Sequence, residues 1–162
     1  MKFIADGMLG KLTRWLRMLG QDVKYSTQFE DFELIATAEK EHRVLLTRDS
    51  QLYKRAIAKN VRAFYVRSQT GAEKLAELAK FFDFSLAIDL NLSRCPRCNS
   101  RIYLMPKETL AGSVEKNTFT YHDEFWKCSK CGQVYWKGAH WNGIHATLEE
   151  AKKMKDTRFS FI

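Results

Sequence analysis

Two Cys-x-x-Cys pairs constrain the fold of this 162-residue chain more than any other feature. All four cysteines fall in them: Cys95 and Cys98 in the first pair, Cys128 and Cys131 in the second, with 29 residues between the pairs. Thiols at this spacing are typical of a zinc site in which four thiolates surround the ion and leave no position for water. The zinc would therefore be structural. Two disulfides or a redox-active pair are the alternatives, and a cytosolic chain favours zinc over both.

The segment before the first cysteine pair alternates between strand and helix patterns. Strands are predicted for residues 2–6, 23–25, 44–47 and 61–66, and helices for residues 9–19, 31–38, 51–59 and 73–82. Strands that alternate with helices predict an α/β fold with a parallel sheet covered on both faces.

The character of the sequence changes after residue 84, where short aromatic segments flank the cysteine pairs. Phe119, Tyr121 and Phe125 alternate as they would along one face of a strand. We therefore expect an α/β domain over residues 1–90, a zinc ribbon over residues 91–145 and a helical tail over residues 146–162.

Three aspartates lie where elements meet at one edge of the predicted sheet. Asp6 ends the first strand, Asp31 begins the helix after the second, and Asp49 follows the third. These junctions share the carboxyl edge, where parallel sheets place their sites. Converging carboxylates suit a hard cation such as Mg²⁺ or Mn²⁺, which can activate water for phosphodiester cleavage. Each Asp alone also fits a helix N-cap, which is the alternative; their common edge favours a metal site.

The first predicted helix carries a basic face. Lys11, Arg14 and Arg17 recur at a spacing of three, on the side away from the leucines, and are predicted to contact phosphate groups of RNA. An ordinary solvated face is the alternative. Arg48, beside Asp49, is predicted to contact phosphate or to form an ion pair.

The overall charge agrees with a polyanionic partner. The formal net charge is +8 and the sequence pI ≈ 9.4, which favours nucleic acid. The first residues do not form a signal peptide and no apolar run is long enough to span a membrane, so we expect a cytoplasmic protein.

Several separate motifs resemble known ribonucleases. The segment DFELIATAEKEHRVLLTRD resembles the D-x-L-I-A-A-T-A…L-x-T-x-D region of PIN-domain ribonucleases, which include VapC-type toxins. Over residues 1–142 the chain resembles the Mut-seven C-terminal (Mut-C) RNase family more closely. The motifs that carry this likeness are the opening KFIADGMLGKLTRWLRMLG, the LLTRD block, the SRCPRCN knuckle and the VYWKGAHW ending.

This resemblance implies a reduced, PIN-like, three-layer α/β/α domain followed by a zinc ribbon. It also implies a metal-dependent RNase in which Asp6, Asp31 and Asp49 are the catalytic, Mg²⁺- or Mn²⁺-binding acids. Larger PIN domains carry a further acid, typically Glu, on a helix that this chain lacks. Glu30 or Glu33, and more remotely Asp89, are the candidates to take its place.

The predicted ribbon has the composition of an RNA-binding module. Residues 91–143 contain eight Lys or Arg and four Asp or Glu, interleaved with aromatic residues. Exposed rings can stack on unpaired bases, although at least half of these rings are expected to form the small core of the ribbon. His140 and Trp141 are the ribbon residues predicted to contact RNA, with His140 on the RNA backbone rather than as a proton donor.

Three functions are compatible with these observations. The leading interpretation is a metal-dependent endoribonuclease that uses structural zinc and catalytic Mg²⁺ or Mn²⁺. The second is a non-catalytic protein on the same scaffold that binds RNA, the ribosome or ribosomal RNA. The third is a VapC-like toxin, which the attached ribbon disfavours because such toxins are usually a bare PIN domain.

Overall fold

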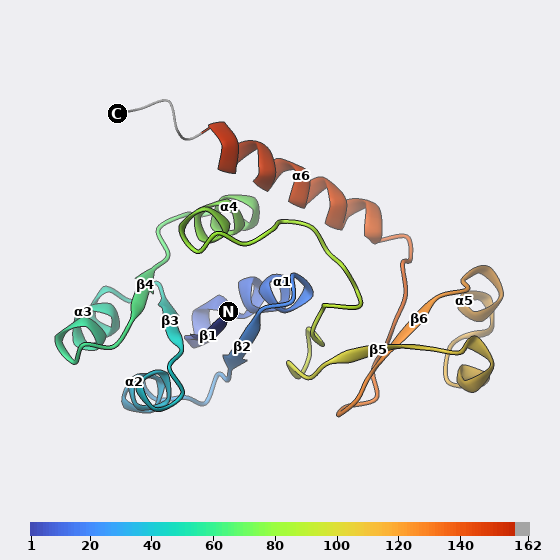
Figure 1. The fold of residues 1–162 in the computed structure, drawn as a ribbon, viewed down its shortest axis with the longest axis horizontal. Helices are drawn as coiled ribbons and strands as arrows, with labels where there is room; N and C mark the ends of the chain where they lie inside the picture. The colour runs from blue at the N-terminus through green and yellow to red at the C-terminus, as the bar shows by residue number, and fades with distance from the viewer. Residues whose placement is uncertain (158–162) are drawn as a thin grey trace.

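The computed structural model describes residues 1–157 (Figure 1), and residues 158–162 of the predicted tail lie outside the described residues. In chain order, the elements of the first half are β1 (Lys2–Ala5), the 3-10 helix η1 (Gly7–Leu9), α1 (Gly10–Met18), β2 (Asp22–Tyr25), α2 (Asp31–Lys40), β3 (Val44–Thr47), α3 (Ser50–Ala58), β4 (Ala63–Tyr65) and α4 (Gly71–Phe81). Those of the second half are β5 (Ile102–Met105), the 3-10 helix η2 (Lys107–Leu110), α5 (Lys116–Tyr121), β6 (Phe125–Cys128), β7 (Val134–Tyr135) and α6 (Trp141–Thr157). Among the described residues, no helix is both long and apolar enough to cross a membrane.

The first half forms a parallel sheet with the strand order β2-β1-β3-β4. In the register of this sheet Phe3 pairs with both Val23 and Val44, and Leu46 pairs with Phe64. Because all four strands run in the same direction, their carboxyl ends lie along one edge. The predicted α/β class with a parallel sheet is confirmed.

Each face of this sheet is covered by its own helices. Phe3 and Leu46 are fully buried in the core shared with α1 and α4, whereas Ile4 and Leu45 are fully buried in the core shared with α2 and α3. Successive strand residues point to opposite faces, so a central strand that is buried on both sides needs an uninterrupted apolar run. This requirement explains the sequence Val44-Leu-Leu of β3 and the three-layer arrangement.

Helix α6 follows β7 and returns across the molecule to lie over α4 (Figure 1). Its Leu148 and Ala151 are buried in the same core cluster as Leu75 of α4. The sequence suggested a short charged helix from residue 146, but the helix already begins at Trp141. It is longer because Ile144 extends the apolar face that packs against this core.

The second half contains an antiparallel sheet of order β5-β6-β7 beside the cysteine pairs. In β6, Phe125 and Trp126 are buried in two separate small cores. The expectation that Phe119 and Tyr121 share a strand with Phe125 is wrong, because both lie on α5. Phe119 instead stacks on Phe125 from that helix, with 6.5 Å between the ring centroids.

The second half is fastened to the free edge of β2 by side chains. The N–H of Val23 donates to Oδ1 of Asn99 (2.9 Å), and the carbonyl of Val23 accepts Nε and Nη2 of Arg17 (3.1 and 2.8 Å). Nη1 of Arg17 also donates to the carbonyls of Pro96 (2.9 Å) and Arg97 (3.3 Å). These contacts occupy polar groups through which an edge strand could pair with another chain.

Candidate active site and metal centre

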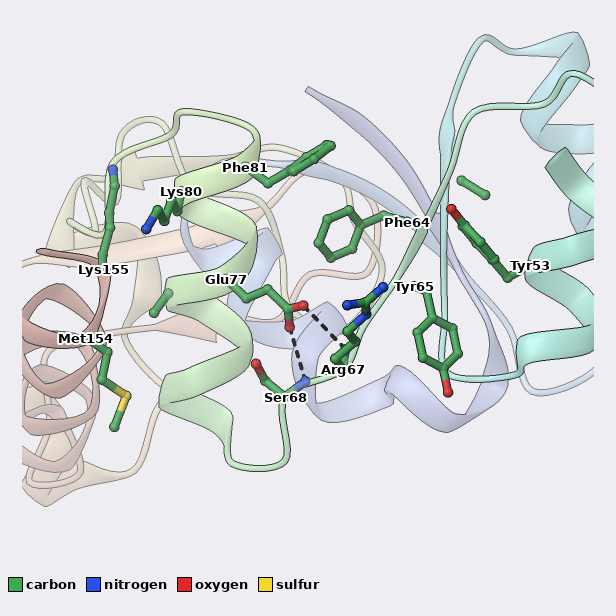
Figure 2. A pocket seen from close by; sticks show the side chains of 12 residues that line it. Tyr53, Phe64, Tyr65, Arg67, Ser68, Glu77, Lys80, Phe81, Met154 and Lys155 are labelled. Atoms are coloured by element: carbon green, nitrogen blue, oxygen red, sulfur yellow. Dashed lines mark hydrogen bonds between the residues drawn. The ribbon is translucent and has the colours of Figure 1, made fainter. Parts of the chain in front are cut away.

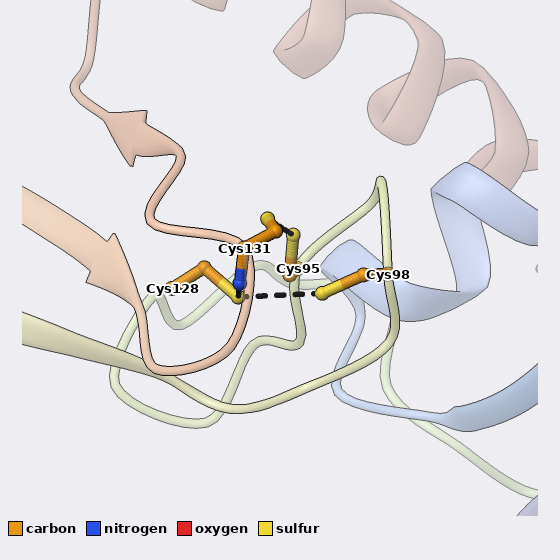
Figure 3. Close-up of side chains that lie close together, drawn as sticks. All are labelled: Cys95, Cys98, Cys128 and Cys131. Carbon is orange, nitrogen blue, oxygen red and sulfur yellow. Dashed lines mark hydrogen bonds between the residues drawn. The ribbon is translucent and has the colours of Figure 1, made fainter.

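The four cysteines come together in a compact group (Figure 3), with Sγ atoms that all lie within 4.8 Å of one another. The Sγ atoms of Cys95 and Cys131 are 3.7 Å apart, and those of Cys98 and Cys128 are 3.3 Å apart. Four sulfurs placed tetrahedrally at about 2.3 Å from a zinc ion would lie about 3.8 Å from one another. The spacing therefore fits a tetrahedral metal such as zinc and is too long for a disulfide, whose sulfurs are about 2.05 Å apart.

The surroundings of these thiols differ. Burial raises the pKa of the Cys95 thiol to about 12, and the hydroxyl of Tyr135 lies 3.0 Å from its sulfur. Burial acts in the same direction at Cys98, but hydrogen bonds from Ser100 and Cys128 outweigh it and lower the pKa of Cys98 to about 6. A bound metal favours the thiolate form at every position, and Tyr135 could then donate to the Cys95 sulfur.

At the carboxyl edge of the parallel sheet, Asp6 and Asp49 belong to one hydrogen-bonded network. Asp6 is 5% exposed; its Oδ1 accepts the N–H of Met8 (2.9 Å), and its Oδ2 accepts the N–H of Arg48 (3.1 Å) and the hydroxyl of Thr47. The Thr47 oxygen in turn accepts the N–H of Asp49 (2.9 Å). The hydroxyl of Thr47 thus links the ends of β1 and β3.

The other two predicted acids have different surroundings. Asp49 is exposed and caps α3, with Oδ1 accepting two N–H groups of the first turn at 2.7 and 3.1 Å. Asp31 is the first residue of α2 rather than its cap, which is Glu30, and its carboxylate forms an ion pair with Arg55 of α3. Within residues 1–157, the cysteines are the one group of three or more possible metal ligands that come together. Asp31 therefore does not join the network of Asp6 and Asp49 in this structure.

The predicted phosphate contacts divide into exposed and buried residues. Lys11 and Arg14 are exposed on α1. The prediction that Arg17 contacts phosphate is wrong, because Arg17 is 5% exposed and its guanidinium is already bound to backbone carbonyls. Arg48 is half-buried beside Asp6, and its Nη2 donates to Oε1 of Gln69 (3.0 Å).

His140 and Trp141 lie at the start of α6. His140 is exposed, whereas the Trp141 ring is partly buried against the core of the second half. That ring also packs edge to face with His145, at 5.5 Å between centroids. Trp141 therefore contributes to packing in this structure.

A groove of about 650 Å³ lies beside β4 (Figure 2). Phe64 and Phe81 form its apolar part, and Glu77 accepts the N–H groups of Arg67 (3.4 Å) and Ser68 (3.2 Å). None of the predicted catalytic or RNA-binding residues lines this groove.

Comparison with known proteins adds one decisive observation. The model of the Mut7-C RNAse domain matches residues 1–148. The chain belongs to the Mut7-C RNAse domain family. No curated protein and no solved structure matched it. Membership indicates a ribonuclease-like function for this Mut7-C protein, with RNA as substrate or partner.

The match of the Mut7-C model includes every predicted acid and all four cysteines. Sequence reasoning about this Mut7-C chain missed Thr47, although its position two residues before Asp49 was a usable signal. It also missed Arg55, whose pairing with Asp31 depends on how α2 and α3 pack and has no local signature.

Proposed function

We propose that this protein is a metal-dependent endoribonuclease whose reaction takes place at the carboxyl edge of the parallel sheet. The observation that supports this most is the Asp6–Thr47–Asp49 network, in which Thr47 joins the carboxylate of Asp6 to the backbone N–H of Asp49 at adjacent strand ends. In a chain of a ribonuclease family, that edge is where a parallel sheet would place its reaction.

The donor atoms suit a hard divalent cation such as Mg²⁺ or Mn²⁺. Each carboxylate oxygen has two acceptor positions, and Oδ1 of Asp6 accepts one hydrogen bond, so one position remains. Oδ2 of Asp49 is not used by the cap of α3. Asp31 is the third carboxylate of the proposal, and its ion pair with Arg55 must open for it to reach the ion.

A bound divalent ion would supply a nucleophilic water and stabilise the leaving oxygen of the phosphodiester. The role of Thr47 is to fix Asp6 in the orientation seen here. In this proposal Arg48, whose backbone N–H donates to Asp6, contacts the phosphate of the substrate with its guanidinium, which bonds Gln69 in the free protein. In this proposal the four cysteines hold structural zinc, which stabilises the ribbon and takes no part in cleavage.

The test compares Asp6→Asn, Asp31→Asn and Asp49→Asn in cleavage of a labelled RNA with Mn²⁺, Mg²⁺ or EDTA. Asp49→Asn is the cleanest variant, because Asn caps a helix about as well as Asp but binds these ions poorly. We expect kcat to fall about a hundredfold or more, the scale seen when one charge-stabilising group is removed. Asp156→Asn, on the exposed side of α6, is the matched control and should cleave normally.

The substitution at Asp6 needs a separate stability measurement. Both oxygens of Asp6 accept hydrogen bonds, so an amide nitrogen would face a donor and lower stability as well as activity. Full cleavage activity of Asp31→Asn and Asp49→Asn would refute the assignment of these acids. A protein that binds RNA but cleaves none under any of the metal conditions would instead be the non-catalytic RNA-binding alternative.

A further inference from the structure

A second groove, of about 570 Å³, lies between helix α1 and the cysteine knuckles. It is lined by residues of both halves of the chain: Gly10, Lys11, Thr13, Arg14, Arg17, Tyr25, Pro96, Arg97, Gln133 and Tyr135. Four of these residues are basic and none is acidic. The groove therefore concentrates positive charge in a concave surface, which attracts anions more strongly than a flat one.

The cations of this groove are not neutralised by the protein. Within residues 1–157, Lys11, Arg14 and Arg97 form no ion pair. The buried hydroxyl of Thr13, in the floor, has no hydrogen-bond partner in the described part of the chain. Like charges that share a groove repel one another, and no acidic side chain of the groove offsets this repulsion. An anionic ligand would therefore lower the electrostatic energy of the groove.

The walls of the groove are held at a fixed separation. Arg17 lies between them and donates from α1 to the carbonyls of Pro96 and Arg97. Asn99 adds a hydrogen bond from its Nδ2 to Oδ1 of Asp22 (2.8 Å). The loop of the first Cys-x-x-Cys pair therefore forms a fixed wall of the groove, and the side chain of Arg97 lies on this wall.

One end of the groove lies close to the candidate acidic edge. The Tyr25 ring lines the groove, and its hydroxyl donates to the carbonyl of Gly7 (3.0 Å), one residue after Asp6. A Cβ at Gly10 would lie 2.6 Å from that hydroxyl, so the approach of Tyr25 to α1 requires glycine there. A polyanionic chain bound along the groove would therefore reach the carboxylates of the candidate acidic edge from the side of α1.

We propose that this groove binds the sugar–phosphate backbone of single-stranded RNA and delivers it to the acidic edge, an inference that rests on the proposed function for the identity of the ligand. Lys11, Arg14 and Arg97 contact phosphates from opposite walls. Tyr25 and Tyr135 provide rings against which unpaired bases can stack, which favours a single strand over a duplex. The zinc knuckle is thereby part of the substrate-binding surface through Arg97, a residue that neither charge nor spacing singled out in the sequence.

The second knuckle offers a matched control for Arg97. Lys130 has the same place in Cys-Ser-Lys-Cys that Arg97 has in Cys-Pro-Arg-Cys, but it is exposed and does not line the groove. Arg97→Glu and Lys130→Glu therefore make the same change of charge at the same knuckle position. Zinc content and circular dichroism of each variant should match those of the wild type, which checks that both variants are folded.

The experiment measures the anisotropy of a fluorescent 12-nucleotide RNA, without added Mg²⁺ or Mn²⁺ so that cleavage does not interfere. We expect Arg97→Glu and Arg14→Glu each to weaken binding about tenfold, and the salt dependence to lose about 0.7 of a unit of slope per phosphate contact. Lys130→Glu should stay within about twofold of the wild type. Equal losses for Arg97→Glu and Lys130→Glu, or no loss for either, would overturn the proposal.

Two further arms separate this proposal from the proposed function. A duplex RNA of equal length should bind more weakly than the single strand, and equal binding would overturn the single-strand assignment. Because affinity is measured without cleavage, a catalytically inactive protein that shows the Arg97 effect supports the groove while refuting the nuclease mechanism. A protein that cleaves RNA but whose affinity does not change in Arg97→Glu supports the nuclease mechanism while refuting the groove.

Discussion

The burial of Arg17 makes a quantitative prediction about how the two halves of the chain are held together. Arg17→Met keeps the apolar stem of the side chain but removes a guanidinium that makes four hydrogen bonds to the carbonyls of Val23, Pro96 and Arg97. Each such bond from a charged donor contributes about 1.5–3 kcal/mol, and the contributions are not additive. We expect a loss of about 3–5 kcal/mol, because three carbonyls lose their partner together.

Urea unfolding and thermal melting measure this loss, with Arg14→Met as the control on the exposed face of the same helix. Arg14→Met should change the free energy of unfolding by no more than about 0.5 kcal/mol. Arg17→Met should lower Tm by roughly 10 °C in a chain of this size. An Arg17→Met protein as stable as Arg14→Met would refute the structural role of Arg17 and restore it as a free surface cation.

Two further predictions concern metal removal and pH. Small metal modules fold with their metal, so a zinc-selective chelator should unfold β5–β7 and change the fluorescence of the buried Trp126. The helices that cover the parallel sheet should keep their circular dichroism signal. Unchanged tryptophan fluorescence after zinc loss would contradict this prediction. At Asp22, burial opposes ionisation, but hydrogen bonds from Arg43 and Asn99 outweigh it and hold the pKa below its ordinary value of 3.8. The stabilisation from this carboxylate is therefore complete above that value and is lost as the pH falls through the lowered pKa, so Asp22→Asn should show a shallower acid transition in a stability–pH profile.

The parallel sheet was predictable from the sequence because its signals are local. The run Val44-Leu-Leu requires burial on both faces, and the helices between strands show their apolar spacing within a few turns. The cysteine group was equally accessible, because a metal site of this kind is encoded in spacing alone. These signals can be read from the sequence without knowing how distant parts of the chain meet.

The contacts at the candidate site that the sequence did not reveal have the opposite origin. Arg17 has the same helical spacing as Lys11 and Arg14, and only the docking of the knuckle at Pro96 and Arg97 buries it. The pairing of Asp31 likewise depends on the neighbouring helix. Helical periodicity reports which residues share a face but not what later covers that face.

The return of α6 to α4 has a consequence for the order in which the chain can fold during synthesis. Residues 82–140, with both cysteine pairs, are made between the two helices. At about 5–20 residues per second, α4 waits roughly 4–15 s before all of α6 exists. During that interval the face of α4 that will cover Leu148 and Ala151 stays open to water or to a chaperone. A newly made chain should therefore be most prone to aggregation after its sheet has formed and before α6 closes over it.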